Sequence, residues 1–195
     1  MSAEQADLFG GALALPADFI YRLDFLSVEE ERTLLGGIAQ LTLEDARYRE
    51  YTARRRVAYF GFDYDFTRNR LAEAAPMPPF LHALRDRMAR WMGIAPEAFV
   101  HALVSEYRPG TPLGWHRDAP DFDRVAGVSL GGRARMRFRP YRKNEPPAKD
   151  KPLVLDLEPR SAYQMNGASR WRWQHSIPPT PELRYSITFR TLRKN

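Results

Sequence analysis

Short β-prone runs, separated by glycine and proline, occupy the chain from residue 99 to residue 192 and restrict what it can fold into. The runs are Phe99–Tyr107, Ala126–Leu130, Arg133–Arg139, Leu153–Leu157, Tyr163–Asn166, Trp171–His175 and Tyr185–Leu192. Runs of this length with turn residues between them are typical of a β-sandwich or barrel. Because two helical patterns precede them, the sequence predicts an α+β, mainly β fold.

Both predicted helices lie N-terminal to these strands. The segment Ser27–Leu41 begins with a capping-box pattern, because Ser27 is followed three residues later by Glu30, and it carries an apolar stripe. The second helix, about Phe80–Trp91, also has one apolar side and is expected to stop at Gly93.

Composition limits the class of protein and its surroundings. With 44% hydrophobic residues in 195, we expect a single globular domain that covers 1–195, preceded by a loose leader over residues 1–15. No apolar run approaches the length of a membrane span, and the absence of cysteine excludes disulfides and thiolate metal sites. We therefore expect a cytoplasmic monomer without membrane association. The net charge of +6 is compatible with a polyanionic partner such as nucleic acid.

A metal-ligand pattern occurs at His116 and Asp118. Two residues apart on an extended strand, their side chains project from the same face. An imidazole beside a carboxylate makes two thirds of the 2-His-1-carboxylate set that binds Fe(II) in non-haem oxygenases. Near the C-terminus, His175 can supply the third ligand, and Arg184 and Arg190 can supply a basic anchor for a dicarboxylate.

From about residue 55 to residue 192 the chain resembles the AlkB family of Fe(II)- and 2-oxoglutarate-dependent dioxygenases. The matching pieces, in the family's order, are Tyr107-Arg108-Pro109-Gly110, His116 with Asp118, Val128-Ser129-Leu130-Gly131, Gly167 with Ser169-Arg170, His175, and Arg184 with Arg190. The resemblance implies a jelly-roll double-stranded β-helix with N-terminal helices and a lid hairpin. It places the catalytic core at 99–192 and the substrate lid at 43–66.

The resemblance also implies the reaction. His116, Asp118 and His175 would hold Fe(II) and leave three positions open. The co-substrate 2-oxoglutarate takes two of them and O2 takes the last. Oxidative decarboxylation then gives succinate, CO2 and an oxidant that attacks a nearby C–H bond. If the carbon is an N-methyl group, its hydroxylated product collapses to formaldehyde and the free amine.

The far carboxylate of 2-oxoglutarate needs a partner, because an unpaired buried charge costs several kcal/mol. Arg184 is the expected partner, in a bidentate contact helped by the Tyr107 hydroxyl. Arg190 is expected nearer the iron-side carboxylate or against the metal ligands. The expected co-substrate site is completed by Ser105, Ser186 and Thr188.

Three departures from the family pattern concern the substrate. Where nucleic-acid demethylases of the family carry asparagine, this chain has Ser105 and Ser186, whose shorter side chains leave room for water. The acidic residue expected two positions after Asp118 is replaced by Pro120, although Asp121 follows. The resemblance therefore supports the oxidative core more strongly than the base-reading apparatus.

Arginines beside aromatics mark the expected lid. Such a surface can hold phosphates and stack on bases, although the same residues also suit a hairpin whose aromatics pack in the core. The candidate substrate contacts are Arg54, Arg55, Arg56, Tyr59, Phe62, Tyr64 and Phe66, with Asp121 beyond the metal site.

A second basic stretch lies at 132–140, where arginine alternates with Ala134, Met136 and Phe138. The alternation predicts a half-buried strand with a basic outer face. That face is either a solvated surface or a flank for nucleic acid.

Other histidines and tryptophans have less specific patterns. His82 is expected on a helix surface, and His101, at the start of a strand, is expected to be structural. Trp171 and Trp173 share a strand face with His175 by period 2 in this interpretation, either around the metal or in the core.

These features support an enzyme that demethylates alkylated DNA or RNA bases with Fe(II), 2-oxoglutarate and O2. One alternative keeps the oxidative core and changes the substrate to a protein, a modified tRNA position or a small molecule. Another is a catalytically silent jelly roll that binds nucleic acid, against which the intact ligand set counts.

Overall fold

The computed structural model describes residues 15–48, 51–65, 70–143, 146 and 151–193. Its strands are β1 (Phe19–Arg22), β2 (Glu44–Tyr48), β3 (Tyr51–Asp65), β4 (Arg70–Glu73), β5 (Phe99–Tyr107), β6 (Leu113–His116), β7 (Phe122–Gly131), β8 (Ala134–Pro140), β9 (Leu153–Leu157), β10 (Ala162–Met165), β11 (Trp173–Ile177) and β12 (Arg184–Leu192). The helices are α1 (Val28–Ile38), α2 (His82–Met92) and α3 (Gly167–Trp171), with short 3-10 turns η1 (Pro79–Leu81) and η2 (Pro96–Ala98). The expected leader lies outside the described residues except at Leu15.

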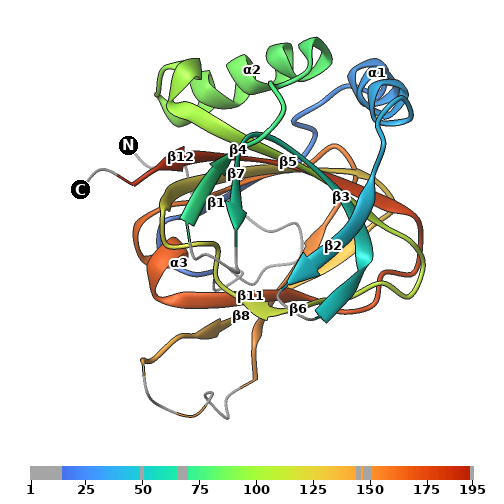
Figure 1. Cartoon of the computed structure of the whole chain (residues 1–195). Helices are drawn as coiled ribbons and strands as arrows, with labels where there is room; N and C mark the ends of the chain where they lie inside the picture. The colour runs from blue at the N-terminus through green and yellow to red at the C-terminus, as the bar shows by residue number, and fades with distance from the viewer. Residues whose placement is uncertain (1–14, 49–50, 66–69, 144–145, 147–150, 194–195) are drawn as a thin grey trace.

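Two antiparallel sheets face each other. The larger, eight-stranded sheet has the order β1-β10-β7-β12-β5-β3-β2, with β4 attached to β3. The four-stranded sheet has the order β6-β11-β8-β9. In Figure 1 the smaller sheet lies below the larger one, and α1 and α2 cover the upper, outer side of the larger sheet. This arrangement confirms the predicted mainly β jelly roll with N-terminal helices.

The two long helices form where capping and apolar spacing predicted them. Ser27 and Glu30 make the reciprocal capping box at the start of α1, which ends three residues earlier than the expected Leu41. α2 stops at Gly93, whose φ of 64° is the left-handed conformation that glycine tolerates best. The buried stripes of both helices pack on Val104, Val128 and Ile187 of the larger sheet.

The space between the sheets holds an apolar core and a cavity next to it. Met136, Phe138, Leu155 and Leu157 of the smaller sheet form a core with residues of β1, β7 and β10. The alternation predicted for 132–140 is therefore confirmed, because its apolar residues point inward. Beside this core, polar side chains and core residues such as Val125 and Met136 line a cavity. Among the described residues, no helix is long and apolar enough to cross a membrane.

One predicted strand is wrong in part. The segment Trp171–His175 was expected to be extended throughout, yet Trp171 is the last residue of α3 and β11 begins at Trp173. Asn166 and Ser169 form a capping box that starts this short helix, a local signal that the period-2 pattern obscured. As a consequence, Trp171 and His175 do not share a strand face, and the indole of Trp171 instead donates to Asp123.

The hairpin 43–66 is partly built into the larger sheet. β2 and β3 pair as predicted, and residues 56–61 of β3 pair with β5. Beyond Gly61, β3 pairs with β4 instead. Gly61 marks this change of partner, with a φ of 79° and no room for a Cβ beside the Val100 carbonyl oxygen.

We expect Gly61→Ala to lower the free energy of unfolding by about 1–3 kcal/mol, because alanine would be strained in this conformation. Gly36→Ala is the matched control: Gly36 lies in α1, is exposed, and a Cβ there meets no atom within 4 Å. The control should stabilise by about 0.5–1 kcal/mol. Urea unfolding measures both, and equal effects of the two substitutions would contradict this assignment.

Candidate metal and dicarboxylate site

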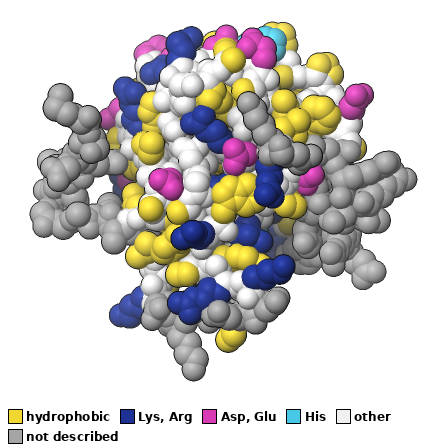
Figure 2. All heavy atoms as spheres, turned by 90° about the vertical axis from the view of Figure 1, so that its left-hand side faces the viewer, with side chains coloured by type: hydrophobic (Ala, Val, Ile, Leu, Met, Phe, Trp, Pro, Cys, Tyr) yellow, Lys and Arg dark blue, Asp and Glu magenta, His cyan; other side chains and the backbone are white. Residues whose placement is uncertain are grey.

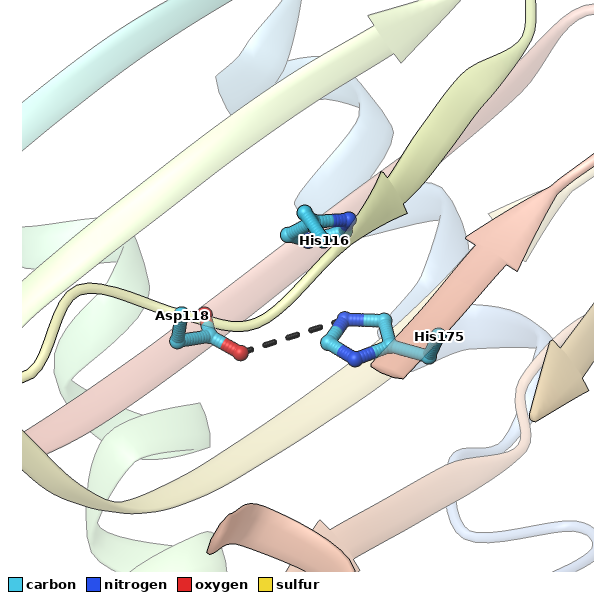
Figure 3. Close-up of side chains that lie close together, drawn as sticks. All are labelled: His116, Asp118 and His175. Atoms are coloured by element: carbon cyan, nitrogen blue, oxygen red, sulfur yellow. Dashed lines mark ion pairs between the residues drawn. The ribbon is translucent and has the colours of Figure 1, made fainter. Parts of the chain in front are cut away.

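Three side chains with metal-ligand atoms meet at the open end of the two sheets. His116 ends β6, Asp118 follows in the turn toward β7, and His175 lies in β11 directly opposite His116. Their side chains point toward one another in Figure 3. One nitrogen or oxygen atom of each lies within 4.8 Å of the others, and the two imidazole rings are 4.2 Å apart. The structure thus brings together the three residues that the sequence predicted as ligands.

A β-bulge makes this meeting geometrically feasible. Leu113 pairs with Ile177 and His116 with His175, so β6 has one residue more than β11 over the same distance. Leu113 and His116 can therefore both line the cavity. Trp115, between them, contacts arginines on the outer face of the smaller sheet.

Arg190 neutralises the buried carboxylate of Asp118. Its Nε and Nη2 lie 2.7 and 2.6 Å from Oδ1. Burial alone would raise the pKa of Asp118, but Arg190, helped by the other charges nearby, holds it well below the ordinary value. Oδ2 has no hydrogen-bond partner within the described part of the chain and lies 3.8 Å from His175 Nε2. One carboxylate oxygen is therefore committed to arginine and the other faces the imidazoles.

Both histidines are held neutral, which is the form that binds a metal. Burial, followed by the neighbouring His116, lowers the pKa of His175 to about 3. Burial also lowers the pKa of His116. The Nδ1 atom of His116 lies 2.9 Å from the Gly114 carbonyl oxygen, which can only accept. Nδ1 therefore carries the proton, and Nε2 has its lone pair available.

The cavity beside the three residues has a volume of about 120 Å³ and contains Arg184 in its lining. Arg184 as a whole is only 1% exposed. Its Nε donates to Ser129 Oγ at 2.9 Å, its Cζ lies 4.9 Å from the centre of the Tyr107 ring, and its Nη1 has no hydrogen-bond partner among the described residues. A buried cation with an unused donor suits a carboxylate ligand.

A row of hydroxyl groups crosses the cavity beside Arg184. Ser105, Ser186 and Ser129 occupy directly paired positions on β5, β12 and β7. Ser105 and Ser186 are buried and line the cavity, as does Thr188, whose Oγ1 donates to the Leu103 carbonyl at 3.4 Å. Sequence reasoning identified Ser105, Ser186 and Thr188 but gave no role to Ser129, because only sheet order places Ser129 next to Arg184.

Tyr163 also lines the cavity and was not foreseen as a site residue. A Cβ on Gly127 would come within 2.5 Å of its ring, so glycine at that position admits the tyrosine. Burial raises the pKa of the Tyr163 hydroxyl, which therefore stays a neutral hydrogen-bonding group. Because Tyr163 lies on β10, far in sequence from the motifs, nothing local indicated it.

Arg170, a motif residue without a predicted role, anchors the ligand-bearing turn. Its guanidinium is 2% exposed, and Nη2 donates to the carbonyl oxygens of Ala119 and Phe122, both at 2.7 Å. The same nitrogen lies 3.3 Å from the carbonyl oxygen of Asp118. Arg170 of α3 thus contacts three carbonyl oxygens of one turn, and these contacts fix the backbone position of Asp118.

His101, which the sequence predicted to be structural, lies behind Arg190 and belongs to the cavity lining. It is 2% exposed, its Nδ1 lies 3.2 Å from Arg190 Nη1, and its ring packs 4.8 Å from that of Phe122. Burial, followed by the charge of Arg190, lowers the pKa of His101 well below its usual range. Neutral His101 can accept a hydrogen bond from Arg190 and so orient the arginine toward Asp118.

The structure separates the arginines of the expected lid. Arg55 and Tyr59 line the cavity. Arg56 instead makes a two-pronged contact with Glu106, at 2.9 Å for each nitrogen, and Arg54 is exposed. Phe62 is half-buried away from the cavity lining, and Asp121 is also absent from it. Of the remaining candidates, Phe66 and the side chain of Tyr64 lie outside the described residues.

Comparison with known proteins agrees with this geometry. Residues 40–190 match the model of the 2OG-Fe(II) oxygenase superfamily. The chain belongs to that superfamily, within its AlkB family. The solved structure of OsALKBH1 superposes with a TM-score of 0.72 over 91% of this chain and 99% of that one, at 15% identity, which supports the same fold.

Relatives of this AlkB-family chain differ in length. The Uncharacterized protein L905 of Acanthamoeba polyphaga mimivirus is 30% identical over 88% of this chain and 83% of its own. The Arabidopsis thaliana protein named Alkylated DNA repair protein ALKBH8 homolog is 29% identical, and the chain spans 53% of it. The Xenopus tropicalis protein named tRNA (carboxymethyluridine(34)-5-O)-methyltransferase alkbh8 is 28% identical, and the chain spans 26% of it.

Enzymes of this superfamily use Fe(II), 2-oxoglutarate and O2, and the residues present fit these groups. Two neutral imidazoles and the free oxygen of Asp118 form the donor set that Fe(II) prefers. The unused donor of Arg184 suits the dicarboxylate. The AlkB-family chain is therefore a dioxygenase with a candidate iron site at His116, Asp118 and His175.

We expect His101→Phe to weaken binding of Co(II), used as a spectroscopic substitute for Fe(II), by roughly tenfold. Partners in direct contact with a metal ligand contribute about 10–100-fold to metal affinity. His101 acts one contact further out, through Arg190, so the lower end of this range is expected. His101→Asn retains an acceptor near the position of Nδ1 and should preserve most of the affinity. Titration by visible absorption measures both, and equal affinities of the Phe variant and the wild type would contradict the positioning role.

Proposed function

We propose that this AlkB-family enzyme removes methyl groups from alkylated bases of DNA or RNA, in repair or in reversal of a modification. His116, Asp118 and His175 hold the iron. Arg184 binds the far carboxylate of 2-oxoglutarate, assisted by Tyr107. Arg190 fixes Asp118, and the hydroxyl groups of Ser105, Ser186 and Thr188 line the co-substrate's path.

The observation that carries the co-substrate assignment is the unused donor of Arg184 in the same cavity as the triad. Burying a guanidinium without a full set of partners is unfavourable, and a carboxylate is the partner that satisfies it best. The cavity volume of about 120 Å³ accommodates only a small molecule. A short dicarboxylate can therefore reach from Arg184 toward the histidines, and a nucleobase must approach from the mouth.

When bound, iron together with 2-oxoglutarate and O2 would supply the oxidising chemistry that converts an N-methyl group to formaldehyde. The chain's own residues orient and protect that chemistry. Arg184 and Tyr107 fix one end of the co-substrate, while Arg190 keeps Asp118 ionised and turned so that Oδ2 faces the histidines. The two neutral histidines donate lone pairs and no protons. Apolar residues such as Leu113, Val125 and Met136 restrict water in the cavity.

Basic and aromatic side chains at the cavity support a nucleic-acid substrate. Arg55, Tyr59 and Arg117 belong to the lining, and the hairpin 43–66 that carries the first two acts as the lid. A methylated base must leave its stack to enter, so an aromatic ring and a phosphate partner near the mouth favour its capture. The name of the Arabidopsis relative mentions alkylated DNA repair, in agreement with this substrate class.

A modified tRNA nucleoside is a second candidate substrate. The frog relative is named for a tRNA methyltransferase that acts on a carboxymethyluridine, although this chain spans only 26% of that protein. Oxidation of such a nucleoside would leave the oxygen on the substrate, without release of formaldehyde. The missing acidic side chain at Pro120 is compatible with this change of substrate.

The function is tested by incubating the iron-loaded enzyme and 2-oxoglutarate with oligonucleotides that carry single methylated bases, in DNA and in RNA. We expect loss of one methylene unit by mass spectrometry, with release of formaldehyde, and no reaction by Asp118→Ala. Bulk tRNA is assayed in parallel. If tRNA gains one oxygen atom and no oligonucleotide is demethylated, the substrate is a modified tRNA nucleoside and not a methylated base.

Arg184→Lys keeps the positive charge but loses the planar fork, so affinity for 2-oxoglutarate should fall by roughly 1.5–3 kcal/mol, about tenfold to 150-fold. Calorimetry with Mn(II) in place of Fe(II) measures this affinity without turnover. Arg160→Lys is the control, because Arg160 pairs with Glu31 and is not part of the cavity lining. An unchanged affinity in Arg184→Lys would assign the anchor to another residue.

A further inference from the structure

The outer face of the smaller sheet carries a row of four arginines, three on β8 and Arg133 directly before it, and their partners divide them into two classes. Arg133 pairs with Glu158 at 2.7 Å and Arg135 with Asp156 at 2.8 Å. Arg137 and Arg139 contact neutral groups instead: Ser176 Oγ at 3.1 Å and Gln174 Oε1 at 2.7 Å. Arg133 and Arg135 are thus paired with carboxylates. The contacts of Arg137 and Arg139 leave their positive charges uncompensated.

Arg137 and Arg139, the two arginines without a carboxylate partner in the described part of the chain, are held in place by an aromatic ring. Their Cζ atoms lie 5.1 and 4.5 Å from the centre of the Trp115 ring, and both side chains are half-buried. Stacking on the indole leaves the edge of each guanidinium free to donate. The arginines are therefore pre-oriented, so less conformational entropy is lost when they bind an anion.

Arg117 connects this face with the cavity. Its guanidinium lies 3.6 Å from the centre of the Tyr141 ring, its side chain is exposed, and it belongs to the cavity lining. No carboxylate pairs with Arg117, Arg137 or Arg139 among the described residues. We call Trp115, Arg117, Arg137, Arg139 and Tyr141 the outer arginine face.

Basic side chains also lie beside this face. Figure 2 views the molecule from an adjoining side, and its lower part, at the level of the smaller sheet, carries Lys, Arg and hydrophobic side chains. Nearby Arg193 lies 4.9 Å from the ring of Trp171, a further arginine beside an aromatic residue. Arg117 is also close to Trp171, because its Nη1 donates to the Trp171 carbonyl oxygen at 3.3 Å.

We propose that the outer arginine face binds the backbone of a single-stranded nucleic acid next to its reactive base, which extends the function proposed above and rests on it. Guanidinium edges match phosphates, and aromatic faces accept stacked bases. A flat sheet surface suits a single strand, whereas reading of a duplex uses an element that enters a groove. The strand runs along β8 and past Arg117 into the cavity mouth.

The row of four arginines supplies its own control. Arg137→Gln/Arg139→Gln and Arg133→Gln/Arg135→Gln remove the same charge from the same face of the smaller sheet. Binding of a fluorescein-labelled single-stranded DNA and of the RNA of the same sequence is measured by anisotropy at several salt concentrations. Circular dichroism and thermal unfolding confirm that both variants are folded.

The first pair should weaken binding and reduce the slope of log affinity against log salt by about 1.4, because each single-strand phosphate contact contributes about 0.7. The second pair should leave the slope unchanged. If wild type binds and both pairs behave alike, the outer arginine face is not the binding surface. If polyglutamate of equal charge competes as well as the oligonucleotide, the face does not distinguish nucleic acid from an acidic protein, and the proposal is overturned.

The outcomes separate this proposal from the proposed reaction. If the wild type demethylates an oligonucleotide but its binding does not depend on Arg137 and Arg139, the proposed surface is wrong and the proposed reaction stands. If binding depends on these arginines but no oligonucleotide is demethylated, the surface stands and the reaction is wrong. If the wild type binds neither DNA nor RNA, both proposals are wrong.

Discussion

Asp118 places a negative charge inside the jelly roll, and the neighbouring residues are arranged around it. Arg190 holds one of its oxygens, and His101 lies behind Arg190 within hydrogen-bonding distance. Arg170 fixes the backbone from which the carboxylate projects. Removing one partner of a buried ion pair typically costs about 3–5 kcal/mol, so Arg190 stabilises the fold as well as the geometry of the site. The remaining oxygen of Asp118 is left for a second cation.

The triad was predictable because its information is local. His116 and Asp118 are only two residues apart, although Asp118 lies in the turn after β6 and not on the extended strand that was expected. His175 and Arg184 follow within short motifs. By contrast, His101, Ser129 and Tyr163 reach the site because β5, β7 and β10 belong to one sheet whose order no short pattern reveals. The prediction for Trp171 was wrong because period-2 spacing does not reveal a short helix, which the capping box of Asn166 and Ser169 indicates.

The division of the lid arginines follows from strand alternation, applied to a strand whose pairing was unknown. Residues 56–61 of β3 pair with β5, which turns Arg55 toward the cavity and Arg56 toward Glu106 on the other side. Arginines that are adjacent in the sequence therefore lie on two different faces of the sheet. Counting basic residues in a segment overestimates how many of them can meet one ligand.

The β-bulge in β6 gives the two faces of the smaller sheet a shared mechanical element. Trp115 stacks with arginines outside while His116, joined to it by a single peptide bond, faces the iron site inside. Because the two residues are adjacent in the chain, a substitution of Trp115 that shifts the backbone of β6 would shift His116 as well. The outer surface of this strand is therefore not free to change independently of the iron site.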